Sequence, residues 1–222
     1  MEKEVLFNNK RKFDININYD FQKILDTTNK YKIYNYYKND LTTCNITLCD
    51  NHIYFNSLIN KETIDVLKLY MHTIVSNIHL INNSFTIYLH INSRGGNIQN
   101  LLDFIAFKSA ITLEIISIIE NNVCDCAILL AATCSYRIIN KNAKCSLSSY
   151  NDLQNLKNYW GYLKQCENNK FEIDSLKNYI YNLFCNVIDS KITKEKLQNY
   201  FMQNCYWDAK KYKKLGLADE IV

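Results

Sequence analysis

The stretch Ile87-Tyr88-Leu89-His90-Ile91-Asn92-Ser93-Arg94-Gly95-Gly96 decides the fold that we predict for this chain. Its first half is dominated by β-branched, aromatic and apolar residues, which are typical of a strand. The strand runs into a turn that holds two of the four glycines in the whole sequence. Because glycine is so rare here, the pair indicates a backbone that needs a positive φ or approaches another segment closely. We therefore predict a strand over residues 85–91 that ends in a tight glycine turn.

Short strands and helices alternate on both sides of this turn. Apolar residues recur at helical spacing in the longer segments, and short apolar runs separate them. The predicted strands cover residues 53–55, 85–91, 113–119, 136–139, 145–147 and 217–222, and the predicted helices cover residues 61–77, 98–110, 126–132, 153–188, 194–201 and 208–215. Gly216 is expected to end the last helix. The alternation predicts an α/β fold.

The first 50 residues differ from the rest of the chain. They are polar and rich in Asn, Lys and Tyr, and they show little periodicity. We expect residues 1–50 to form a loosely ordered N-terminal arm and residues 51–222 to form the folded domain. No internal repeat and no Gly-, Ser- or Pro-rich linker divides the second part, so one domain is expected.

The composition excludes several classes of protein. The net charge is only +4, from 26 Lys and Arg against 22 Asp and Glu, so we expect no nucleic-acid partner. No run of about 18 uncharged apolar residues occurs, so we expect no membrane-spanning helix and no membrane partner. Pro is absent, and residues with AT-rich codons (Asn, Lys, Ile and Tyr) are frequent, which indicates an AT-rich genome.

The nine cysteines indicate a reducing compartment rather than a disulfide framework. Their number is odd, and several lie inside apolar segments, where a thiol serves as a small apolar side chain. The spacings Cys124-x-Cys126 and Cys44-x4-Cys49 resemble metal-binding pairs, but neither has a second pair at zinc-finger spacing. We therefore expect no metal site and no cofactor.

The quoted stretch resembles the strand and turn of the ClpP family, the proteolytic subunits of ATP-dependent Clp proteases. That family usually reads Ile-Tyr-Leu-Tyr-Ile-Asn-Ser-Pro-Gly-Gly there, so Arg94 replaces a proline. Two further stretches agree in order and roughly in spacing. Residues 119–132 resemble the nucleophile turn and the helix after it, and residues 206–219 resemble the C-terminal pattern of an aromatic pair, a helix and a Gly-Leu-Val-Asp ending. The resemblance covers about residues 53–222.

This resemblance implies a fold, an assembly and a mechanism. The fold is a crotonase-like spiral of strand-strand-helix units with a protruding handle helix, here at about residues 151–190. The assembly is a pair of stacked seven-membered rings around a closed chamber, built as homo- or hetero-oligomers of ClpP-type subunits and served by an Hsp100 ATPase. The mechanism is that of a Ser-His-Asp triad, in which an imidazole takes the proton of a hydroxyl and a carboxylate orients the imidazole.

The three triad residues are absent from the matching positions. Alignment places Cys124 at the nucleophilic serine, Ser148 at the histidine, and Tyr200 at the aspartate, or Asn199 with a slip of one residue. No histidine follows His90, which we expect to be a core or interface residue rather than a base. A thiol can act as a nucleophile, but its usual pKa of about 8.5 leaves only a few per cent thiolate at neutral pH.

The oxyanion hole that the resemblance implies is also altered. One donor would come from the turn of Gly95 and Gly96, which is kept. The other would come from the residue after the nucleophile, which is Asp125, and its carboxylate would repel both a thiolate and a developing oxyanion. Glu120 stands where the family has the glycine that opens the nucleophile turn. Together these changes predict a degenerate site.

The hypothesis with most support is a non-catalytic subunit of a Clp protease core. The chain is several residues longer than the family over about residues 151–166, as inactive ClpR-type paralogues often are. An alternative is a Cys-dependent peptidase, which labelling of Cys124 together with peptide turnover would reveal. A less favoured alternative is another crotonase-fold enzyme, such as an acyl-CoA hydratase or isomerase, which acyl-CoA binding would reveal.

The expected location is a plastid stroma, including the relict plastid (apicoplast) of an apicomplexan parasite. This expectation combines the AT-rich composition with the ClpR-like pattern. No transit peptide is visible, which suits either a trimmed mature form or a chain encoded inside the organelle. A cytoplasmic setting stays open.

Overall fold

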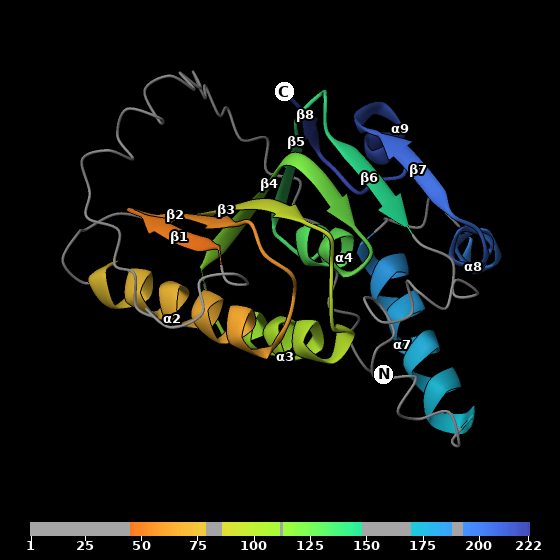
Figure 1. Ribbon diagram of the computed structural model, residues 1–222, viewed down its shortest axis with the longest axis horizontal. Coiled ribbons are helices and arrows are strands. Elements are labelled where there is room, and N and C mark those ends of the chain that lie inside the picture. Colours follow the sequence, from red (N-terminus) through yellow and green to blue (C-terminus); the bar gives the residue numbers. More distant parts are fainter. Residues whose placement is uncertain (1–44, 79–85, 112, 148–169, 188–192) are drawn as a thin grey trace, which may run out of the picture. The chain divides into compact units, whose positions relative to one another are not determined.

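One β-sheet of eight strands organises the part of the chain that the computed structural model describes (Figure 1). The described residues are 45–78, 86–111, 113–147, 170–187 and 193–222, and all of them belong to one compact unit, Ile33–Val222. The elements in chain order are β1 (Ile46–Cys49), β2 (His52–Phe55), α2 (Lys61–Ile78), β3 (Thr86–Ser93), α3 (Ile98–Ser109), β4 (Glu114–Cys124), α4 (Cys126–Ala132), β5 (Tyr136–Ile139), β6 (Lys144–Leu147), α7 (Lys170–Val187), α8 (Lys194–Met202), β7 (Cys205–Asp208), α9 (Ala209–Lys214) and β8 (Glu220–Ile221).

The sheet has the strand order β1-β2-β3-β4-β5-β8, with only β1 antiparallel to its neighbour. The long strand β4 changes partners along its length. Its residues Ile116 to Ile119 pair with β5, whereas Asn122 to Cys124 pair with β6. β6 in turn pairs antiparallel with β7. The end of β4 therefore starts a branch of the same sheet, which β6 and β7 continue.

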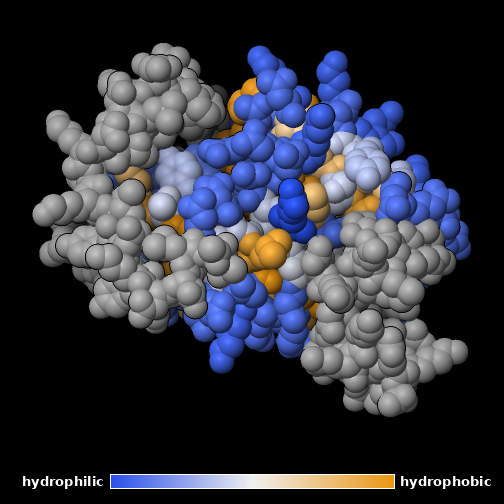
Figure 2. Space-filling model, viewed as in Figure 1, coloured by the Kyte–Doolittle hydropathy of each residue, from blue (hydrophilic) through white to orange (hydrophobic). Residues whose placement is uncertain are grey.

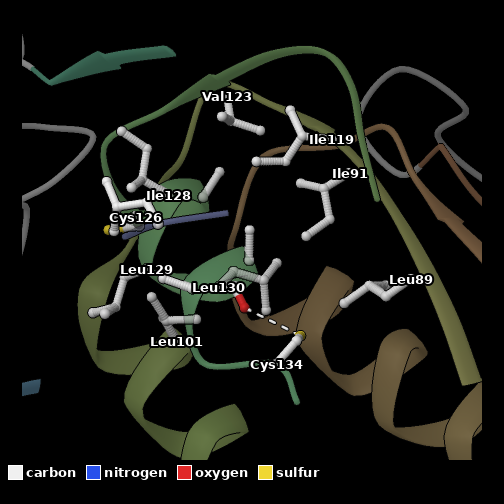
Figure 3. Close-up of a cluster of buried hydrophobic side chains, with 14 of the residues drawn as sticks. Leu89, Ile91, Leu101, Ile119, Val123, Cys126, Ile128, Leu129, Leu130 and Cys134 are labelled. Atoms are coloured by element: carbon white, nitrogen blue, oxygen red, sulfur yellow. Dashed lines mark hydrogen bonds between the residues drawn. The ribbon is translucent and has the colours of Figure 1, made fainter. Parts of the chain in front are cut away.

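Alternate residues of the central strands point to opposite faces of the sheet. Along β3, Leu89 and Ile91 are fully buried and face the helices, while Tyr88 and His90 face the other way and contact side chains of β2. α2 and α3 pack together below the sheet in the view of Figure 1. α4 lies closest to the strands, and all seven of its residues are buried (Figure 3). Its small residues at Ala127, Ala131 and Ala132 allow this close approach.

The α/β prediction is confirmed, but several strands differ from the sequence analysis. β1 and β7 were not predicted, and β4 runs five residues beyond the predicted end at residue 119. β1 is part of the sheet, so residues 46–49 belong to the folded domain, although residues 1–50 were predicted to be a loosely ordered arm. The rest of that arm, residues 1–44, lies outside the described residues.

The helix expected at residues 153–188 is seen as α7 from Lys170 onward, because residues 148–169 lie outside the described part of the chain. α7 buries Ile180, Tyr181 and Phe184 near its C-terminal end, and it packs against α4 and α8 there. None of the helices in the described residues is long and apolar enough to cross a membrane.

Candidate active site

The glycine turn after β3 meets the turn between β4 and α4. Gly95 has a φ of +84°, and a Cβ on it would lie 2.7 Å from the carbonyl oxygen of Cys124. Gly96 has a φ of +152°, and a Cβ on it would lie 2.1 Å from the carbonyl oxygen of Ile59. Both glycines are therefore required by close backbone approach, as the sequence predicts. The structure brings Gly95, Gly96, Cys124 and Asp125 together.

Hydrogen bonds within the chain hold the glycine turn. The Ser93 hydroxyl donates to the carbonyl oxygen of Ser57 at 2.6 Å and accepts from the N–H of Gly95 at 3.2 Å. The N–H of Ile59 donates to the Gly95 carbonyl at 2.8 Å, and the N–H of Asn97 donates back to the Ile59 carbonyl at 2.7 Å. The N–H of Gly95, a candidate oxyanion donor, thus already has a partner inside the turn.

Asp125 occupies the sharp turn into α4. Its φ of 51° and ψ of −118° form a combination that residues other than glycine rarely adopt. Its residue surface is only 3% exposed. Its N–H donates to the carbonyl oxygen of Ser146 at 3.0 Å, which extends the pairing of β4 with β6. The second candidate oxyanion donor is therefore also engaged by the protein itself.

The Cys124 thiol is half-buried at the end of β4. Burial raises its pKa, and the Asp125 carboxylate raises it further, while a hydrogen bond with Ser146 and the charge of Arg94 lower it. The net shift is upward, so the thiol form is favoured at neutral pH. This is the direction expected from the sequence for a thiol beside Asp125.

Of the other two predicted triad positions, only Tyr200 lies within the described residues. Ser148 lies outside them. Tyr200 sits on α8, where its ring meets Trp207 edge-on with centroids 5.4 Å apart. Asn199, the alternative to Tyr200, is exposed on the same helix. Trp207 belongs to the core, so this contact fixes α8 against β7.

Asn204 is the residue just before β7, a strand that the sequence analysis did not predict. It directly precedes Cys205, the strand residue that pairs with Leu147 at the end of β6. The neighbouring β6 residue, Ser146, pairs with both Tyr206 and Cys124. Ser146 is therefore the residue beside Cys124 that the sequence analysis did not name, and only the pairing of β4 with β6 reveals it.

Three polar side chains form a hydrogen-bonded line across β2, β3 and β4, which we call the histidine chain. The His52 Nδ1 atom lies 2.9 Å from the His90 Nε2 atom, and the His90 Nδ1 atom lies 2.8 Å from a carboxylate oxygen of Glu120. Tyr88 stacks on His52 with centroids 4.6 Å apart, and Tyr54 stacks on His90 at 4.2 Å. Both histidines therefore make hydrogen bonds and ring contacts on one face of the sheet.

The histidine chain limits where protons can sit. Because two ring nitrogens face each other, one must be unprotonated to accept the hydrogen bond. Burial lowers the pKa of His52 to about 4, the charge of His90 lowers it too, and Asp50 opposes the shift. His52 is therefore neutral at pH 7. The remaining described histidine, His72, packs edge-on against Phe107 at 5.2 Å.

The described residues hold no group of three or more His, Cys, Asp or Glu side chains that could bind a metal ion. The cysteines among them are all free thiols, and Cys126, Cys134 and Cys145 are buried. The Cys126 thiol donates to the carbonyl oxygen of Gly96 at 3.2 Å, which ties α4 to the glycine turn.

The sequence model of the Clp protease family matches residues 42–222. This chain belongs to the Clp protease family. Two solved structures are similar to it. The ClpP protease catalytic domain from Plasmodium falciparum is 23% identical, with a TM-score of 0.60 over 76% of this chain and 83% of that one. A peptidase from Plasmodium falciparum is 16% identical, with a TM-score of 0.60 over 78% of this chain and 95% of that one. None of the curated proteins compared with the chain matches it.

Clp family membership confirms the expected fold as well as the resemblance. The two solved structures share the mixed α/β ClpP-like fold, and at these identities the likeness establishes fold alone. The glycine turn, the end of β4 and the start of β7 occupy the region that the family motifs mark. The identities of Cys124 and Asp125 then decide what chemistry the region can support.

Proposed function

We propose that this chain is a non-catalytic subunit of a Clp protease, similar to ClpR-type paralogues, that completes rings together with catalytic ClpP-type subunits. One observation carries the proposal: the half-buried Cys124 thiol is followed directly by the buried Asp125 at the turn into α4. A serine-peptidase site needs an activated nucleophile and free oxyanion donors at this turn, and the contacts described above supply no activated nucleophile and engage the N–H groups of Gly95 and Asp125.

The nucleophile lacks an activating base in the contacts that the structure describes. Cys124 interacts with Ser146, Asp125 and Arg94, none of which accepts a proton readily from a thiol at neutral pH. A buried carboxylate next to the thiol opposes the thiolate. His90, which could serve as a base in another setting, is instead bonded to His52 and Glu120.

The oxyanion donors support the same proposal. The N–H groups of Gly95 and Asp125 donate to Ser93 and Ser146, so a reacting carbonyl oxygen would have to displace two internal hydrogen bonds. It would also approach the Asp125 carboxylate. Removing one oxyanion donor alone costs about 100-fold to 1000-fold in turnover in a serine protease, so engagement of the Asp125 N–H together with the lack of an activating base predicts background rates.

A Cys-dependent peptidase is the second candidate, and two contacts favour it. Ser146 and Arg94 both lower the pKa of the Cys124 thiol, although burial outweighs them. A third candidate, an acyl-CoA enzyme of the crotonase fold, has less support because the Clp protease model spans residues 42–222.

The test combines assembly with activity. The pure chain and a mixture with a catalytic ClpP-type subunit are analysed by native mass spectrometry, and hydrolysis of fluorogenic peptides is measured in both. We expect background hydrolysis by the pure chain and mixed rings with the catalytic subunit. If the pure chain hydrolyses the peptides and loses this activity when iodoacetamide alkylates Cys124, the Cys-dependent peptidase would be supported instead.

The proposal includes an Hsp100-type ATPase as the partner of the mixed ring and a plastid stroma as its location. Cross-linking of assembled mixed rings to the ATPase, with catalytic rings alone as the control, tests the partner. Immunolocalisation against a plastid marker tests the location, and a purely cytoplasmic signal would contradict it.

A further inference from the structure

The antiparallel strands β1 and β2 form a hairpin at one edge of the sheet (Figure 1). A turn of two residues, Asp50 and Asn51, joins them. Among the described strands, the hairpin pairs with the rest of the sheet only through the four-residue parallel ladder between β2 and β3. Figure 2, drawn from the same side, shows both hydrophilic and hydrophobic side chains in this region. The hairpin can therefore separate from the sheet with the loss of one short ladder.

Side chains on both faces of β2 hold it against the rest of the fold. On the face that carries the helices, Ile53 and Phe55 are fully buried in the core. On the opposite face, His52 and Tyr54 contact the aromatic rings of β3. The first contact is apolar and does not change with pH, whereas the second contains the histidine chain. Of these two contacts, acid can weaken only the second.

The two imidazole rings of the histidine chain leave room for one proton between them. The Nδ1 atom of His52 lies 2.9 Å from the Nε2 atom of His90. The other ring nitrogen of His90 keeps its proton, because it donates to the Glu120 carboxylate at 2.8 Å. A neutral pair of rings, or a pair with one positive charge, can keep the hydrogen bond between them. If both rings are charged, two N–H groups face each other and this hydrogen bond is lost.

Neighbouring tyrosines limit how the rings can avoid this conflict. Tyr88 stacks on His52 with centroids 4.6 Å apart, and Tyr54 stacks on His90 at 4.2 Å. Neither ring can rotate away from the other without losing a stacking contact. Two charged rings therefore push β2 away from β3.

The titratable groups around the two rings favour one positive charge and oppose a second. Glu120 of β4 balances a charge on His90. Asp50 in the hairpin turn attracts a charge on His52, but burial and the charge of His90 outweigh it, so the pKa of His52 falls to about 4. Cys49 of β1, which pairs with His52 across the hairpin, and the two stacked tyrosines are neutral in acid.

We propose that the histidine chain is an acid-sensitive switch that opens the β1–β2 hairpin while the rest of the sheet stays folded. In the opened state the two rings separate, and His52 takes up a proton as readily as it does in an unfolded chain. Acid therefore favours the opened state over the closed one. The strands β3, β4 and β5 keep their other partners when the hairpin opens. At neutral pH, the burial of Ile53 and Phe55 keeps the hairpin closed.

Hydrogen exchange of the full chain, measured by mass spectrometry in low concentrations of urea, distinguishes this local opening from global unfolding. The measurement is made at about pH 7 and about pH 4.5, with exchange times scaled to equal intrinsic exchange, and we expect residues 46–55 to exchange about fivefold faster at the lower pH. Their exchange should depend little on urea, and it should be faster than that of residues 114–119 and 136–139 in β4 and β5. If all three segments exchange at one rate with the same urea dependence, the hairpin opens only by global unfolding and the proposal is overturned.

His52→Gln removes the titrating ring but keeps a side chain that can donate a hydrogen bond to His90. Exchange of residues 46–55 in this variant should differ less than about twofold between the two pH values. The matched control is His72→Gln, which changes a histidine that packs on Phe107 and should keep the full response of the unaltered chain. Equal responses of the two variants would overturn the proposal.

Glu120→Gln tests the same proposal in the opposite direction. Without this carboxylate even the first charge on the two rings is unbalanced, so the closed hairpin binds protons less readily. We expect the faster exchange of residues 46–55 to begin at a higher pH than in the unaltered chain. A shift to lower pH, or no shift, would overturn the proposal.

Discussion

At the scale of single residues, Asp125 adopts an energetically costly backbone conformation at the turn into α4. The positive φ of Asp125 persists because its N–H is fixed to Ser146 and the following helix is completely buried. A conformation of this kind costs about 1 to 3 kcal/mol when the residue is not glycine. The strain is a consequence of where β4 ends and α4 begins.

Replacing Asp125 by glycine should therefore stabilise the fold, whereas replacing it by alanine should not. Both variants remove the carboxylate, but only glycine relieves the backbone strain. We expect Asp125→Gly to exceed Asp125→Ala by about 1 kcal/mol in the free energy of unfolding. Urea denaturation measures the difference, and equal stability of the two variants would contradict the strain.

Gly96 should tolerate no side chain. A Cβ would lie 2.1 Å from the carbonyl oxygen of Ile59, which is backbone and cannot rotate away. We expect Gly96→Ala to destabilise the chain by about 3 kcal/mol or more, because the β3–α3 turn must then separate from the segment before α2. Thermal denaturation measures the loss, and Ser109→Ala on exposed helix surface serves as the control. A drop as small as that of Ser109→Ala would show that the turn is adaptable.

The two glycines were predictable from the sequence, but the strain at Asp125 was not. Rarity of glycine in this chain makes a pair of them conspicuous. The φ of Asp125 depends instead on β4 continuing beyond residue 119 and pairing with β6, a contact between segments about 20 residues apart. Hydrophobic periodicity carries no information about such a contact, because Glu120, Asn121 and Asn122 interrupt the apolar run.

At the scale of secondary structure, elements buried on all sides were predicted best. α4 has the predicted bounds because its uninterrupted small and apolar residues fit only a buried helix at that length. β1 and β7 escaped prediction because neither has an uninterrupted apolar run, and each contains exposed or half-buried residues beside its one buried residue. Trp207 carries the main apolar contact of β7, and a single large residue does not mark a strand.

The histidine chain should make stability depend on pH. The pKa of His52 falls to about 4 in the folded protein, while an unfolded histidine has a value near 6.5. At pH values between about 4 and about 6.5, His52 is protonated in the unfolded protein but stays neutral in the folded protein. Stability that is fully present above about pH 6.5 is therefore lost as the pH falls towards 4, by about 1 kcal/mol after allowance for solvent.

His52→Gln should flatten this pH dependence, because glutamine can donate a hydrogen bond to His90 but does not titrate. Urea denaturation of the unaltered protein and of His52→Gln, between about pH 7 and about pH 4.5, measures how the free energy of unfolding changes with pH. His72→Gln changes a histidine that is not part of the histidine chain. In this variant the free energy of unfolding should depend on pH as steeply as in the unaltered protein. If His52→Gln and His72→Gln have the same slope, the histidine chain does not control the acid response.

The C-terminal strand depends on the clasp between Arg137 and Asp219. The guanidinium contacts both carboxylate oxygens at 2.8 and 2.9 Å and donates to the Gly216 carbonyl at 2.9 Å. Asp219→Asn should destabilise the chain by about 1 to 2 kcal/mol, because the partly buried guanidinium then loses its counter-charge. Chemical denaturation measures this, with Asp103→Asn on the exposed side of α3 as the control.

At the scale of the whole molecule, the residues that determine the fold are different from those that determine the chemistry of the site. The Clp protease family model spans residues 42–222, and the sheet, the glycine turn and α4 follow the ClpP-like fold. The sequence predicts this fold because its motifs encode backbone geometry. The chemistry depends on a few side chains, and the contact of Ser146 with Cys124 became visible only through the β4–β6 register.

The most direct test of the central proposal compares the pure chain with its Cys124→Ala variant in a peptide-hydrolysis assay. A catalytically silent subunit predicts the same background rate for both proteins, since removal of an inactive thiol changes nothing. The variant should also enter mixed rings with a catalytic ClpP-type subunit as readily as the unaltered chain. Hydrolysis above background that disappears in Cys124→Ala would show that the thiol is a working nucleophile and would contradict the account.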